Sequence, residues 1–285
     1  MKKIILLLLT ILLLTGCNSN TRNIENKKNT IAVSIVPEEN FIEKIVGDKF
    51  NIITLIPPGS SPSSHQPSPK QLQELSNADL YFTIGVATEK ANILPVISEY
   101  ENLKIVNLAN EIDSIYPARY FDNNNLSRDP HIWLSPKRVI EIIKIMEKEL
   151  INQYPEYEDV FSTNSKNYIS ELNTLDSYIK EKLNLIETKD FIIYHPSYGY
   201  FADDYGLNMI EIEVEGKNAS IDKLNDIIKY AKENNLKSIF YQAEMSSKQA
   251  KIIASEIDIE TVKLEPLSKN YIESLKFLIN SMVGE

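Results

Sequence analysis

The chain contains three histidines, and each lies in a segment that we expect to form a loop. His65 lies in a proline-rich stretch, His131 follows Pro130 shortly before an expected helix start, and His195 follows an apolar run typical of a strand. A neutral imidazole is a good ligand for Zn²⁺, Mn²⁺ or Cu²⁺, and distant loops can assemble a site without any local ligand motif. A lone histidine in a loop is more often a surface residue, but three together predict a metal site.

A metal held by these histidines could serve catalysis, structure or transport. A zinc hydrolase needs an open coordination position with a general base beside it. Its usual helical signature, two histidines one turn apart, is absent from the sequence. We therefore expect a binding protein and not an enzyme. An exported zinc-dependent hydrolase and a surface adhesin with a structural metal are the alternatives.

Two kinds of segment, strand-like and helix-like, alternate along the chain and would hold these loops in place. Short β-branched or aromatic runs are followed by segments of helical apolar spacing, which predicts parallel sheets with crossover helices. His195 then stands at the carboxyl end of a strand, where open parallel sheets place their ligands. The predicted strands lie near residues 31–35, 51–56, 80–84 and 104–106, and a second set lies near 191–194, 209–212, 238–241 and 261–264.

A long helix is predicted between the two sets of strands. Pro136 is well placed at a helix start and Pro155 at a break, and apolar residues from Tyr168 to Leu183 then recur with helical spacing over several turns. We expect α/β lobes at residues 30–152 and 187–285, joined by a rigid helix at 153–186, with the metal site in the cleft between the lobes.

The N-terminus has the build of a secretory signal over residues 1–16: two lysines, an apolar run and a small-residue ending. Leu14-Thr15-Gly16-Cys17 resembles the lipobox of bacterial lipoproteins, in which the cysteine is acylated and begins the mature chain. Cys17 is the only cysteine, so the exported body needs no disulfide. We expect a lipid anchor on Cys17, a flexible spacer over residues 17–29, and a body on the extracytoplasmic face of the cell membrane. An ordinary cleaved signal with a chance cysteine is the alternative.

The net charge of −10 argues against nucleic acid as a partner, because an acidic surface repels phosphates. The acidic residues are spread along the helices and mainly favour solubility. We expect a monomer.

Several segments, in this order, resemble the cluster A-I substrate-binding proteins of zinc and manganese ABC importers. The resemblance covers nearly the whole mature chain. It is carried by Pro57-Pro58-Gly59 with the proline-rich loop, Leu75-Ser76-Asn77-Ala78-Asp79-Leu80, Asp129-Pro130-His131-Ile132-Trp133, His195-Pro196-Ser197-Tyr198-Gly199, and Leu264-Glu265-Pro266-Leu267.

The resemblance implies a two-lobed protein that binds one divalent ion in the interlobe cleft and delivers it to an ABC permease. His131 and His195 match the second and third histidine ligands of the family, and Glu265 matches its late carboxylate ligand. The family usually places its first histidine directly after the proline at Pro62, whereas here His65 stands two residues further on.

We expect His65, His131, His195 and Glu265 to be the metal ligands. This set is rich in nitrogen and favours Zn²⁺ as the transported ion over Mn²⁺, which prefers more carboxylate. Glu265 replaces the usual aspartate and changes the geometry more than the chemistry, because both carboxylates are good oxygen ligands.

Overall fold

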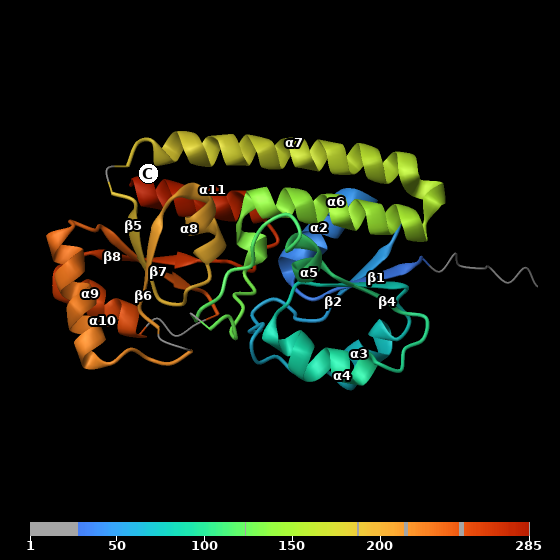
Figure 1. Ribbon diagram of the computed structural model, residues 1–285, viewed down its shortest axis with the longest axis horizontal. Coiled ribbons are helices and arrows are strands. Elements are labelled where there is room, and N and C mark those ends of the chain that lie inside the picture. The colour runs from blue at the N-terminus through green and yellow to red at the C-terminus, as the bar shows by residue number, and fades with distance from the viewer. Residues whose placement is uncertain (1–27, 123, 187, 214–215, 245–247, 285) are drawn as a thin grey trace, which may run out of the picture.

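The computed structural model describes residues 28–122, 124–186, 188–213, 216–244 and 248–284 (Figure 1). The expected signal peptide, Cys17 and most of the expected spacer lie outside the described residues. Within the described residues, no helix is both long and apolar enough to cross a lipid bilayer.

The N-terminal sheet is parallel and has the strand order β2-β1-β3-β4. Its central strands β1 (Thr30–Val33) and β3 (Leu80–Thr83) are buried along their whole length, as β-branched and aromatic runs covered on both faces should be. The edge strands are β2 (Asn51–Thr54) and β4 (Lys104–Asn107). Its helices are α2 (Val36–Val46), α3 (Pro69–Leu75), α4 (Leu94–Ile97) after a π-helical turn, and α5 (Leu108–Ile112).

The C-terminal sheet repeats this arrangement with the order β6-β5-β7-β8, again parallel. Its strands are β5 (Asp190–Ile193), β6 (Asn208–Glu211), β7 (Ser238–Gln242) and β8 (Glu260–Leu264). The associated helices are α8 (Gly199–Tyr205), α9 (Ile221–Glu233), α10 (Lys248–Ile257) and α11 (Tyr271–Val283). In each sheet, the second strand in sequence lies on one side of the first strand, and the later strands lie on its other side. Open parallel sheets bind ligands at such a topological switch point.

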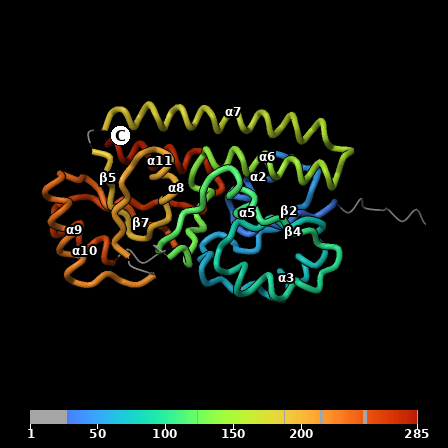
Figure 2. The backbone as a smooth tube through the Cα atoms, in the orientation of Figure 1, coloured from blue at the N-terminus to red at the C-terminus, as the bar shows by residue number. Residues whose placement is uncertain are grey.

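A long helix joins the lobes. Helix α6 (Pro136–Gln153) begins at the expected proline and is followed by a 3₁₀ turn at Pro155. Helix α7 (Glu158–Leu183) then runs for 26 residues along one side of both lobes (Figures 1 and 2). Its buried stripe includes Tyr168, Leu172, Leu175 and Ile179. The predicted fold of two α/β lobes with parallel sheets and a long connecting helix is thereby confirmed.

Helix α11, at the end of the chain, packs against α7 and reaches the first lobe. The Tyr271 ring meets the Phe41 ring of α2 edge-on, with 5.1 Å between the ring centroids. One continuous apolar core contains residues of both lobes and of α7. The lobes are therefore packed together along this side of the molecule, where α7 spans both of them (Figure 2).

Candidate metal centre

Two of the predicted ligands, His131 and His195, meet from opposite lobes. Their ring centroids lie 5.2 Å apart, and the rings are inclined by 75°. His131 precedes the 3₁₀ turn Ile132–Leu134 in the first lobe, and His195 follows β5 in the second. Their side chains are 12% and 27% exposed, so both imidazoles are in partial contact with solvent. Because a zinc–nitrogen bond is about 2.0–2.1 Å long, two imidazoles this close can share one ion.

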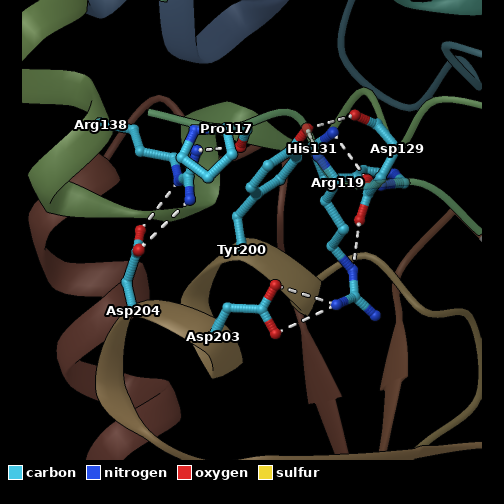
Figure 3. A network of polar contacts seen from close by, with 8 residues as sticks. All are labelled: Pro117, Arg119, Asp129, His131, Arg138, Tyr200, Asp203 and Asp204. Carbon is cyan, nitrogen blue, oxygen red and sulfur yellow. Dashed lines mark hydrogen bonds and ion pairs between the residues drawn. The ribbon is translucent and has the colours of Figure 1, made fainter. Parts of the chain in front are cut away.

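A carboxylate orients each of these imidazoles. Oδ1 of Asp129 lies 2.7 Å from Nδ1 of His131 (Figure 3), and Oε2 of Glu213 lies 3.0 Å from Nδ1 of His195. Both carboxylates are buried. An acceptor at Nδ1 favours the tautomer that carries its proton there and leaves the Nε2 lone pair for a metal. The arrangement therefore leaves two imidazole nitrogens able to bind a metal.

The sheet positions Glu213. The backbone ladder between β5 and β6 continues past the strand ends, with Ile212 N donating to Ile193 O and Glu213 N donating to Tyr194 O, each at 2.9 Å. Sequence reasoning missed Glu213, although an acid just past a strand in the same lobe as His195 was a usable signal. Asp129 belongs to the Asp129-Pro130-His131-Ile132-Trp133 segment, but the sequence did not indicate its contact with His131.

The backbone at His195 is fixed by Gln242 at the end of β7. The Gln242 amide nitrogen donates to the His195 carbonyl at 2.6 Å, and its amide oxygen accepts from the His195 N–H at 3.3 Å. The same nitrogen also lies 2.7 Å from the Ser197 hydroxyl oxygen. Since Gln242 is itself buried, these contacts fix the backbone of His195 just beyond the carboxyl end of β5.

Trp133 connects the histidine pair to the loop that carries Glu265. Its ring centroid lies 5.1 Å from that of His131, and its Nε1 donates to the Pro266 carbonyl at 2.9 Å. Pro266 directly follows Glu265. The backbone of the expected carboxylate ligand is thus tied to the neighbourhood of His131.

The side chain of Glu265 points largely into solvent. It is 58% exposed and lies 3.5 Å from Lys263 Nζ. A second acid, Glu244, follows β7, which lies between the strands that precede His195 and Glu265. Burial raises the pKa of Glu244, and the nearby charge of Glu265 adds to that rise. Sequence reasoning did not single out Glu244.

His65 lies in the loop between β2 and α3 and is held through its backbone. Its carbonyl accepts from Asn92 Nδ2 at 2.8 Å and from Thr88 Oγ1 at 3.3 Å. The Nε2 atom is buried and has no hydrogen-bond partner. His65 and Glu265 do not join the histidine pair: in the described part of the chain, no three His, Cys, Asp or Glu side chains gather closely enough to hold one ion.

Comparison with known proteins gives two family matches. Residues 31–284 match the family described as the zinc-uptake complex component A, periplasmic (ZnuA), and residues 1–18 match the prokaryotic membrane lipoprotein lipid attachment site. The second match covers the segment in which the lipobox was predicted. The protein is therefore lipid-anchored at the extracytoplasmic membrane surface, as expected.

Individual relatives extend along most of the chain. The high-affinity zinc uptake system protein ZnuA of Bacillus subtilis is 30% identical over 274 residues, which cover 90% of this chain and 85% of that protein. The zinc-binding lipoprotein AdcA of Streptococcus pneumoniae is 28% identical over 282 residues, so 94% of this chain spans about half, 56%, of that longer protein. A crystal structure of ZnuA superposes with a TM-score of 0.83 at 34% identity, covering 90% of this chain and 98% of that one. The chain belongs to the ZnuA family.

Proposed function

We propose that this protein is the substrate-binding component of an ABC importer, capturing Zn²⁺ in the interlobe cleft and delivering it to a membrane permease. One observation carries the proposal. The ring centroids of His131 and His195, which come from opposite lobes, lie 5.2 Å apart, and a buried carboxylate lies at Nδ1 of each ring. An ion bound between them would bridge the lobes, which suits a receptor that must release its cargo. The names of the ZnuA and AdcA relatives support zinc as that cargo.

We infer that His65 and Glu265 complete the shell after a small movement of the loops or lobes. The buried, unpartnered Nε2 of His65 supports this, because an unpaired buried polar atom costs roughly 1–3 kcal/mol and a bond to the ion would remove that cost. The hydrogen bond from Trp133 to Pro266 also supports the inference, because it holds the backbone next to Glu265 beside Trp133, whose ring contacts His131. Three nitrogens and one carboxylate oxygen suit tetrahedral Zn²⁺, with Mn²⁺ as the second candidate.

A zinc hydrolase is a poor fit to the same geometry. Its general base would have to stand free beside an open coordination position. The carboxylates that touch the histidine pair, Asp129 and Glu213, are instead hydrogen-bonded to the imidazoles. An adhesin with a structural metal differs from a receptor in another way, because removing a structural metal unfolds the protein that depends on it.

The membrane attachment follows the same proposal. A lipid on Cys17 would hold the body near its permease, and the chain would act as a monomer. Mass spectrometry of the purified protein should find acyl chains on Cys17, and removal of the lipid should leave the zinc affinity unchanged. A membrane-bound protein without acyl chains on Cys17 would contradict the anchor.

Metal binding is tested with protein stripped by a chelator and studied by titration calorimetry. We expect one Zn²⁺ per chain, displacement of Mn²⁺ by Zn²⁺ in competition, and an unchanged circular dichroism spectrum after stripping. Absence of binding to either ion would overturn the proposal. Unfolding on metal removal would instead favour the structural role.

A further inference from the structure

Arg119 lies in the loop between α5 and the 3₁₀ turn and contacts both lobes (Figure 3). Its Nε is 3.2 Å from Oδ2 of Asp129, the carboxylate whose other oxygen faces His131. Its Nη1 lies 3.1 and 3.0 Å from the two carboxylate oxygens of Asp203 on α8. Because α8 follows the His195 segment in the second lobe, one side chain connects the partner of His131 to the opposite lobe.

Gly199, at the start of α8, makes room for this side chain. A Cβ at this position would lie 2.1 Å from Arg119 Nε and 2.7 Å from Arg119 Cδ, far closer than atoms can approach. The backbone of Gly199 does not have a positive φ, so its conformation does not require glycine. Passage of the Arg119 side chain is therefore the feature that a larger residue at position 199 would block.

The backbone around Arg119 is also tied to α8. The hydroxyl of Tyr200 accepts from Arg119 N at 2.9 Å and donates to Asp129 O at 3.0 Å. Asp129 N in turn donates to Arg119 O at 2.9 Å. A displacement of α8 would consequently move Arg119 and Asp129 together, and with them the acceptor for His131.

The contact between Arg119 and Asp129 is close but misaligned. Both Nε of Arg119 and Oδ2 of Asp129 are buried, and neither makes a hydrogen bond. Alignment of the two groups would stabilise both, since unpaired buried polar atoms are costly and charge-assisted hydrogen bonds are strong. A small change in their relative position would therefore strengthen the contact.

We propose that Arg119 is a positioning residue that couples the arrangement of the lobes to metal affinity. It holds Asp129 against His131 when α8 is docked, and metal binding between the lobes strengthens the same contact. The inference rests on the proposed metal-binding function. Arg138 also reaches α8, where it pairs with Asp204 at 2.9 Å, but it touches no carboxylate that contacts a histidine.

The test compares Arg119→Gln with Arg128→Gln. Arg128 lies in the same loop, beside Asp129 in sequence, but its guanidinium pairs with Asp113 at 2.6 Å. We expect Arg119→Gln to lower zinc affinity about tenfold, at the low end of what residues supporting metal ligands contribute, mainly through faster dissociation. Arg128→Gln should stay near wild type. Dissociation into a chelator can be followed by the fluorescence of Trp133, whose ring lies beside His131.

Gly199→Ala provides an independent perturbation, because it displaces Arg119 without removing it. The double variant Arg119→Gln/Gly199→Ala should lose no more affinity than the more affected single variant, and Arg119→Lys should recover part of the loss. Additive losses, equal losses in Arg119→Gln and Arg128→Gln, or wild-type affinity in Arg119→Gln would each overturn the inference. If Arg119→Gln does not fold, Gly199→Ala and Arg119→Lys replace it in the test. Each should then release zinc faster than the wild-type protein. Failure of the wild-type protein to bind zinc would instead count against the proposed function itself.

Discussion

The four candidate ligands form two pairs: His131 and His195 are the ordered half of the site, and His65 and Glu265 are the less ordered half. His131 and His195 each have a buried carboxylate at Nδ1 and lie against each other across the lobes. His65 has a buried nitrogen without a partner, and Glu265 is mostly exposed beside a lysine. Under the proposed function, one half of the site is ordered without an ion, and the other half would have to move to reach it.

This difference suits a protein that binds tightly and then releases. Side chains that are already ordered lose little conformational entropy on binding, so we expect the ordered half to supply most of the affinity. Ligands that must move into place can also leave first, which opens a route for the ion to depart.

His131→Ala and His195→Ala remove the ordered half directly. Each variant should lose more than about 100-fold in zinc affinity, because loss of a ligand exceeds the 10–100-fold cost of losing a residue that supports one. Calorimetry measures the affinity, and circular dichroism should show an intact fold. Wild-type affinity in either variant would refute the assignment of that histidine.

Glu213→Gln probes the orientation of His195 without removing a ligand. The amide keeps the size of the side chain but loses the charge that favours the proton on Nδ1, so zinc affinity should fall roughly tenfold or more. Glu211→Gln is the matched control, because Glu211 lies two residues earlier in β6 and its carboxylate is 3.8 Å from Lys223. Equal behaviour of the two variants in calorimetry would mean that the ordered half does not depend on its carboxylates.

Much of this architecture was predictable from the sequence. Alternating β-branched runs and helical spacing predicted the strands of both sheets, because buried parallel strands need continuous apolar segments and a long amphipathic helix needs a sustained period. The position of His195 at a strand end followed from the same pattern. The convergence of His131 and His195 was inferred mainly from family resemblance, since no local spacing encodes it.

Other features required the structure. The pairing of β6 with β5 brings Glu213 to His195, and a sequence does not state which strands are neighbours. Arg119 reaches Asp203 across 84 positions of the chain, a contact that no periodic pattern contains. The irregular loop around His65 has no repeating geometry, so its distance from the other histidines was not predictable.

His65→Ala tests the less ordered half. We expect roughly a tenfold loss in zinc affinity or less, smaller than for His131→Ala, because water or the Ser63 hydroxyl can take the vacated coordination position. Ser63→Ala is the control in the same loop and should stay near wild type in calorimetry. A loss as large as that of His131→Ala would abolish the distinction between the two halves.

Glu265→Gln should give the smallest change among the ligand variants. Its carboxylate is largely exposed and lies beside Lys263, and the amide of Gln keeps an oxygen that can still face the ion, so zinc affinity should fall less than in any of the histidine variants. Glu244→Gln is the informative comparison, because β7, which precedes Glu244, lies directly beside β5, whereas β8, which precedes Glu265, lies one strand further away. If Glu265 is the ligand, Glu244→Gln has the weaker effect in calorimetric competition. A larger loss of affinity in Glu244→Gln than in Glu265→Gln would mean that Glu244, after β7, is the carboxylate ligand in place of Glu265, after β8. The less ordered half of the site would then be partly preformed.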